Sequence, residues 1–99
     1  MGMVDILKQY LESTIKIIVD NPNDVKIDVI TSTKTILVQI KTAKVDCGKV
    51  IGRKGKTIEA LKIIAAAVKN TKFSNDARNV VLEILEDENS GFKSIKKDG

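Results

Sequence analysis

Ten residues, GKVIGRKGKT at positions 48–57, carry the side chains best suited to chemistry in this sequence. They combine three glycines with four basic residues. Because glycine has no Cβ, an anion can approach the backbone closely, while lysine and arginine supply attracting charge. The stretch therefore suggests a phosphate site, although an ordinary turn would also use glycines.

A nucleotide-binding P-loop is the first interpretation of this stretch. That motif requires glycine, four residues of any type, and then Gly-Lys-Ser or Gly-Lys-Thr, directly after a buried strand. Gly55, Lys56 and Thr57 match its end, but Val50 stands where the first glycine is required. Residues 45–51, which precede the loop, have helical character instead of strand character. The sequence therefore argues against a nucleoside triphosphatase.

Two interpretations remain for the pair of glycines at the centre of the stretch. In a plain corner between helices, Gly52 and Gly55 would only supply positive φ angles, which leaves the basic pair Arg53 and Lys54 unexplained. A Gly-x-x-Gly corner that opens a helix also presents outward N–H groups and the positive end of the helix dipole. Apolar residues beside such a clamp suit bases, so this interpretation favours single-stranded nucleic acid.

The positive charge of the chain is concentrated around this stretch. The net charge is +4, but residues 41–72 hold nine lysines or arginines against two acids, Asp46 and Glu59. Residues 1–40 and 73–99 each hold more acids than bases. A basic patch favours a polyanion through attraction and counterion release. A solvated lysine-rich face is the alternative.

Hydrophobic periodicity predicts six elements that would position the stretch. The first two strands are close enough in sequence to form an antiparallel hairpin, and the helical link to the third strand allows a parallel, right-handed crossover. We expect one α+β domain over residues 4–86, with helices packed on one face of a three-stranded mixed sheet. A polar C-terminal tail, residues 87–99, follows. The predicted elements are a helix over 4–19, strands over 25–29 and 36–40, a short helix over 45–51, a helix over 56–69 and a strand over 79–85.

Residues 50–58, VIGRKGKTI, resemble the KH-domain signature V-I-G-x-x-G-x-x-I at every fixed position. The predicted element order resembles the type II, bacterial arrangement. Residues 18–25, IVDNPNDV, and 46–52, DCGKVIG, are similar to the small bacterial KH proteins of the KhpA family, and the likeness covers roughly residues 4–86. Cys47 departs from the expected bulkier apolar residue and should occupy a packing position.

The resemblance implies a site that clamps single-stranded RNA with loose sequence preference, in an RNA chaperone-like regulator linked to cell division and cell shape. It also implies self-association or pairing with a larger KH-domain protein. The connection 70–78, longer than the family pattern, is expected to shape one end of the groove. The implied residues are Gly52, Arg53, Lys54 and Gly55 in the clamp, Val50, Ile51 and Ile58 in the groove with Val38 and Ile40 as neighbours, and Lys41, Lys44, Lys49 and Lys56 at the rim.

Two functions other than RNA binding are possible for such a sequence. A protein-interaction module would use the same fold for dimerisation or docking. An enzyme is disfavoured, because the chain has no histidine and its one cysteine, Cys47, has no local partner for nucleophilic catalysis. We expect no catalytic residue, metal or cofactor.

Cysteine content and hydropathy suggest the cellular compartment in which the protein acts. A single cysteine fits a reducing compartment. The longest fully apolar run, residues 63–68, is too short to cross a bilayer, and no apolar leader opens the chain. These features favour the cytoplasm and argue against a membrane partner.

Overall fold

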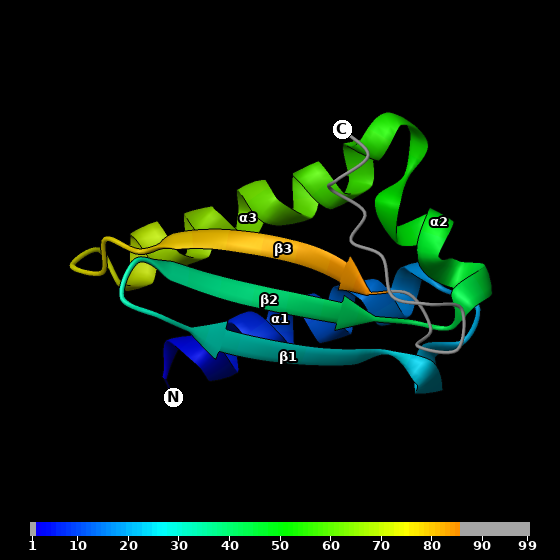
Figure 1. Cartoon of the computed structure of the whole chain (residues 1–99), viewed down its shortest axis with the longest axis horizontal. Coiled ribbons are helices and arrows are strands. Elements are labelled where there is room, and N and C mark those ends of the chain that lie inside the picture. Colours follow the sequence, from blue (N-terminus) through cyan, green and yellow to red (C-terminus); the bar gives the residue numbers. More distant parts are fainter. Residues whose placement is uncertain (1, 86–99) are drawn as a thin grey trace.

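The computed structural model describes residues 2–85, so the predicted tail, residues 87–99, lies outside the described residues. The predicted order of helices and strands is confirmed (Figure 1). Short 3₁₀ turns join several of the elements. The elements are α1 (Met3–Ile18), η1 (Pro22–Asp24), β1 (Lys26–Thr31), β2 (Thr35–Lys41), η2 (Lys44–Asp46), α2 (Cys47–Ile51), η3 (Arg53–Gly55), α3 (Lys56–Lys72) and β3 (Asn79–Leu85).

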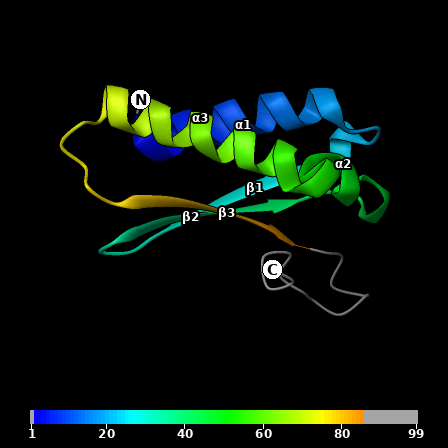
Figure 2. The same cartoon turned by 90° about the horizontal axis from the view of Figure 1, so that it is seen from above.

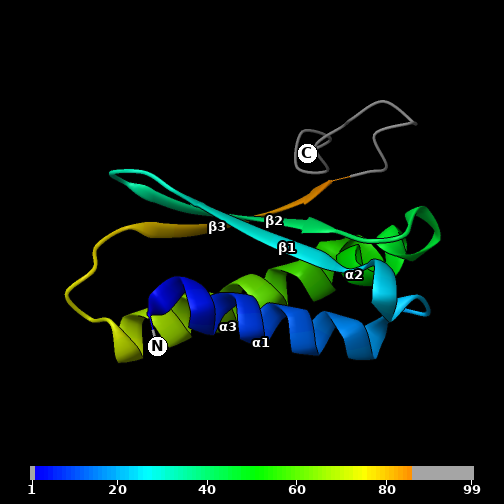
Figure 3. The ribbon, with the colours of Figure 1, turned by 90° about the horizontal axis from the view of Figure 1, so that it is seen from below.

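The sheet has the order β1-β2-β3, with β1 antiparallel and β3 parallel to the central strand β2. Figures 2 and 3 show α1 and α3 side by side on one face of this sheet. No described element covers the opposite face. The predicted mixed sheet with helices on one face is therefore confirmed. Within residues 2–85, no helix is long and apolar enough to span a membrane.

The hydrophobic core lies between the sheet and the two long helices. Alternate residues of β2 point toward the helices and are fully buried, and the register places Ile40 between Ile27 of β1 and Ile84 of β3. From α1, Leu7, Leu11 and Ile15 recur at helical spacing, which places them on the face that packs onto the sheet. Branched aliphatic side chains thus fill a core that has almost no aromatic residues.

The largest boundary difference is at the end of α3, which continues to Lys72 instead of ending at residue 69. Lys69 is only 6% exposed, and its Nζ donates a hydrogen bond of 2.6 Å to the main-chain oxygen of Asp76. This bond gives the buried ammonium group a polar partner and connects the last turns of α3 to the segment that follows. The following connection, residues 73–78, lies at the far end of α3 from residues 52–55 (Figure 1).

The buried face of α1 gives a test of this packing. Replacing Leu11 by alanine should lower the free energy of unfolding by about 2–5 kcal/mol, because it leaves a cavity in the core. The matched change Ile17→Ala, on the same helix but at a side chain 83% exposed, should stay within about 0.5 kcal/mol of the parent. Urea unfolding measures both. Similar losses for the two variants would contradict the observed orientation of α1.

Candidate nucleic-acid interface

The predicted corner is present between α2 and α3, at the end of the sheet where β2 and β3 terminate (Figure 1). Three of its four residues have positive φ: Gly52 at 78°, Lys54 at 57° and Gly55 at 73°. The Gly52 N–H closes α2 on the Gly48 oxygen at 2.9 Å, and the Gly55 N–H bonds the Gly52 oxygen at 3.1 Å. The chain thus reverses within one tight turn, and the N-terminal N–H groups of α3 lie directly behind the loop.

The two glycines serve different purposes. A Cβ on Gly52 would come within 2.8 Å of the Thr57 backbone nitrogen and 2.1 Å of its Oγ1, so this position is filled by the chain itself. A Cβ on Gly55 would meet nothing within 4 Å. Gly52 is therefore required by close packing inside the corner. Gly55 is favoured only by its left-handed backbone, and the space beside it is open.

A hollow of about 340 Å³ begins at this open side. It runs between the first two turns of α3 and the neighbouring strand β3. The positions that α3 contributes have helical spacing, which places them on one face. The lining residues are Lys54, Gly55, Ile58, Glu59, Lys62 and Leu82.

Leu82 and Lys62 are lining residues that the sequence prediction missed. The expected strand neighbours were Val38 and Ile40 of β2, but both are fully buried in the core. β2 is the central strand, and its helix-facing side chains are covered, whereas β3 is the edge strand beside the hollow. A signal for Leu82 existed, because a right-handed crossover places the strand that follows a helix close to that helix.

The apolar residues predicted around the loop separate into two groups. Ile58 lines the hollow. Val50 is fully buried, so the expectation that its side chain lies in the groove is corrected to a packing position. Ile51 is half-buried against the core and does not line the hollow. The residues on either side of a tight corner point in different directions, and their apolar type alone does not distinguish groove from core.

The predicted basic residues also differ in their exposure and in their ion pairs. Arg53, Lys54 and Lys56 are exposed at the corner or on the first turn of α3. Lys49 instead forms ion pairs, with its Nζ 3.3 Å from Asp20 Oδ2 and 3.7 Å from Asp46 Oδ1. Much of its charge is therefore balanced inside the protein. Lys41 is half-exposed and Lys44 is exposed, and neither lines the hollow.

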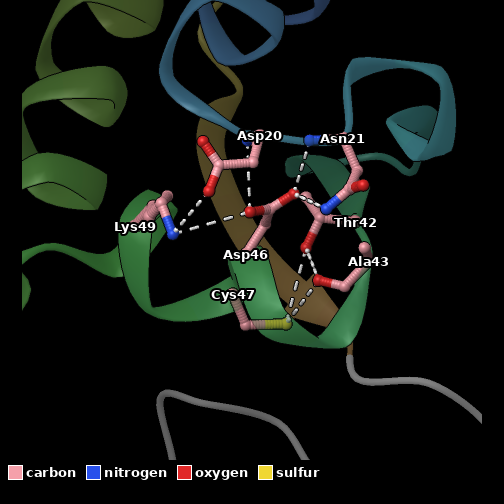
Figure 4. A network of polar contacts seen from close by, with 7 residues as sticks. All are labelled: Asp20, Asn21, Thr42, Ala43, Asp46, Cys47 and Lys49. Carbon is pink, nitrogen blue, oxygen red and sulfur yellow. Dashed lines mark hydrogen bonds and ion pairs between the residues drawn. The ribbon is translucent and has the colours of Figure 1, made fainter.

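A buried carboxylate holds the segment that leads into this corner (Figure 4). Asp46, at 0% exposure, accepts hydrogen bonds from the backbone N–H groups of Asp20 at 3.2 Å and Asn21 at 2.9 Å. The Asn21 side-chain amide donates a third, at 3.0 Å. Burial alone would raise the pKa of the Asp46 carboxyl, but these bonds and the Lys49 charge hold it below its ordinary value. The turn after α1 is thereby fixed to the residue that precedes α2.

Cys47 is half-buried beside this network. Its sulfur lies 3.5 Å from Thr42 Oγ1 and 3.9 Å from the Ala43 oxygen (Figure 4). The expected packing role for this cysteine fits that environment. Within residues 2–85, no group of three or more histidine, cysteine, aspartate or glutamate side chains could hold a metal ion.

Fold and corner together define the class of the protein. An α-β-β-α-α-β domain with a Gly-x-x-Gly corner between its second and third helices is a KH domain of type II. A family model described as the KH domain of KhpA/KhpB matches residues 8–84. The chain belongs to this KhpA/KhpB family, in agreement with the resemblance found in its sequence.

Individual relatives agree with this assignment. The RNA-binding protein KhpA of Chlamydia pneumoniae is 38% identical over 81 residues, which is 82% of this chain and 99% of the relative. KhpA of Clostridium acetobutylicum is 38% identical over 80% of this chain and 100% of the relative. KhpA of Mycobacterium tuberculosis is 39% identical over 67% of this chain and 82% of the relative. Each of these relatives is named an RNA-binding protein, and none of the three is named an enzyme. No solved structure gives a significant match.

The two glycines of the corner give a matched pair of variants. Gly55→Ala should cost only the strain of a left-handed backbone, about 1–2 kcal/mol. Gly52→Ala should lower the free energy of unfolding by more than this, because the new Cβ also overlaps the Thr57 backbone nitrogen. Urea unfolding of both variants measures the difference. Equal losses would show that the chain does not pack closely at Gly52.

The Asp46 network predicts a dependence of stability on pH. The pKa of this carboxyl is lower in the folded chain than the ordinary value of 3.8, so its contribution to stability is present above about pH 4 and is lost as pH falls through the folded pKa. Asp46→Asn should therefore destabilise the protein at neutral pH, and the difference from the parent should narrow below about pH 4.

Denaturant unfolding from pH 7 down to pH 3 provides the measurement for Asp46. Asp24→Asn, at the exposed neighbouring turn, is the matched control and should differ little from the parent throughout. A loss for Asp46→Asn that stayed constant across this range would contradict an ionised network.

Proposed function

We propose that this protein binds single-stranded RNA, with the phosphates at the corner formed by Gly52, Arg53, Lys54 and Gly55 and the bases in the adjacent hollow. The observation that carries the proposal is the position of that hollow, which opens directly beside the exposed basic loop. Polyanion backbone and apolar bases would thus be bound by two different surfaces of one site. The names of the relatives, RNA-binding protein KhpA, support this function.

Each side chain has a distinct proposed role. Arg53 and Lys54 attract phosphates at the tip of the loop, and Lys56 and Lys62 extend the charge along α3. Ile58 and Leu82 supply the apolar surface under the bases. Val50, Ile51 and Lys49 support the loop from behind, through packing and ion pairing rather than by direct contact with RNA.

Loose sequence preference and modest affinity are expected from this composition. Within residues 2–85, no aromatic side chain lines the hollow, so these residues offer no base stacking of the kind that strengthens many single-strand binders. Weak binding that tolerates many sequences suits an RNA chaperone-like, post-transcriptional regulator in the cytoplasm.

The resemblance to KhpA extends this proposal to regulation of cell division and cell shape. We assign RNA binding to residues 4–86 and regard residues 87–99 as an appended tail.

A second candidate function is docking to another protein, either a second copy or a larger KH-domain protein. Exposed aliphatic side chains on α3 favour it, because Ile63 is 61% and Ile64 49% exposed. Association would also raise RNA affinity by bringing two weak sites together. The two functions are compatible, but they differ in what the basic loop contacts, which is RNA in the first and a protein partner in the second.

Binding to a short fluorescent random-sequence RNA across a salt series tests the proposed function. The slope of log affinity against log salt should be about −2 to −3, which corresponds to three or four phosphates at about 0.7 per phosphate. Arg53→Asp with Lys54→Asp should abolish binding while circular dichroism shows a folded protein.

The matched control is Lys26→Asp with Lys34→Asp, which makes the same two charge reversals at exposed positions of β1 and of the β1–β2 turn, neither of which lines the hollow. It should keep most of the affinity, apart from the general effect of charge. Equal losses in the two double variants would mean that net charge and not the loop determines binding. Loss of a protein partner with RNA affinity intact, in the loop variant, would favour the docking function.

A further inference from the structure

Six of the described residues, 2–85, line the hollow, and Glu59 is the one carboxylate among them. It lies on the same face of α3 as Ile58 and Lys62, and Leu82 of β3 forms the opposite wall. The side chain is exposed, and within residues 2–85 no ion pair or hydrogen bond engages it, although Lys56 and Lys62 lie three residues to either side. Its oxygens are therefore available to a ligand in the hollow.

An acid at this place needs a reason, because it opposes the phosphate charge that the loop attracts. Its position in the first turn of α3 gives a favourable interaction with the helix dipole. That interaction, however, would be the same on any side of the helix. A carboxylate on the side of the hollow is best explained by the part of the nucleotide that is not charged, which is the base.

The hydrogen-bonding capacity of a carboxylate decides which base it suits. An ionised carboxylate only accepts, and its two oxygens can receive two parallel N–H donors. The Watson–Crick edge of guanine offers two adjacent donors, at N1 and at the N2 amino group. Cytosine and adenine offer one amino group next to an acceptor, and uracil offers one N–H between two carbonyl oxygens.

We propose that Glu59 is a specificity-determining residue that selects guanine at the base position between Ile58 and Leu82. This inference rests on the proposed RNA-binding function and adds a preference at one nucleotide to an otherwise tolerant site. Uracil is the least favoured base, because its two carbonyl oxygens face the carboxylate. A bidentate pair to a base edge discriminates by about fivefold at the lower end of its range, and this hollow is open to solvent.

The probes are short oligouridines of equal length that carry guanosine, inosine or uridine at one central position. Inosine keeps the N1 donor of guanine but lacks the N2 amino group, so it tests the second hydrogen bond alone. A single guanosine in this context also avoids the self-association of oligoguanosine. Affinities are measured by fluorescence anisotropy at one fixed salt concentration, with the parent protein and with Glu59→Gln.

The parent should bind the guanosine probe about fivefold more tightly than the uridine probe, with inosine between them. Glu59→Gln should bring the ratio between the guanosine and uridine probes close to one, and its affinity for the uridine probe should rise, because a repulsive charge is removed. The matched control Asp28→Asn removes the same charge at an exposed position of β1. It should leave the base ratio unchanged, whereas a general effect of charge would change the ratio in both variants. A merely structural role of Glu59 would weaken binding to all three probes alike and would not raise affinity for the uridine probe.

Other outcomes separate the inference from the function on which it rests. If the parent binds all three probes equally well, or if Glu59→Gln keeps the preference for guanosine, Glu59 does not read the base and the inference is overturned while RNA binding stands. If the parent binds none of the probes even at low salt, the proposed RNA-binding function fails and the inference fails with it.

Discussion

The geometry of the corner depends on a carboxylate that is shielded from water. Asp46 receives three hydrogen bonds from Asp20 and Asn21. The Lys49 ammonium pairs with the carboxylates of both Asp20 and Asp46. A buried charge is tolerated only when such partners compensate for its lost hydration. The network connects the turn after α1 with Asp46, which immediately precedes α2 and lies six residues before Gly52. The loop is thereby anchored to the first helix as well as to the sheet.

This anchoring explains how a short segment can hold the corner in a defined conformation. α2 is a helix of only five residues, too short to be stable by itself. Val50 attaches it to the core, Asp46 fixes its beginning, and the close contact of Gly52 with Thr57 fixes its end. On the proposed function, fixed backbone donors would lose little entropy when a phosphate binds, so a preorganised loop would compensate for a small number of contacts.

The sequence predicted the frame of the protein better than the lining of its site. The alternating apolar residues of β2 and the apolar stripe of α1 identified the buried faces, because residues that face the core recur with the period of their strand or helix. Around the corner this signal is ambiguous. Val50 and Ile58 are both aliphatic and both flank the loop, but one is in the core and the other lines the hollow. Leu82 lies far away in sequence, and only the order of the strands brings it to the same place.

The sequence also does not reveal which basic side chains are free to meet a ligand. Counted along the chain, residues 41–72 hold a large excess of lysine and arginine, yet these charges do not act together. Lys49 is paired with acids, and the ammonium of Lys69 is buried against a backbone carbonyl. The exposed basic residues at the corner and along the start of α3 are Arg53, Lys54, Lys56 and Lys62, and Glu59 stands among them with the opposite charge. The positive charge open to a ligand is therefore smaller than the composition suggests, and Glu59 adds an opposite charge to the lining of the hollow. On the proposed function, this mixture of charges would favour selection of a nucleotide over simple accumulation of a polyanion.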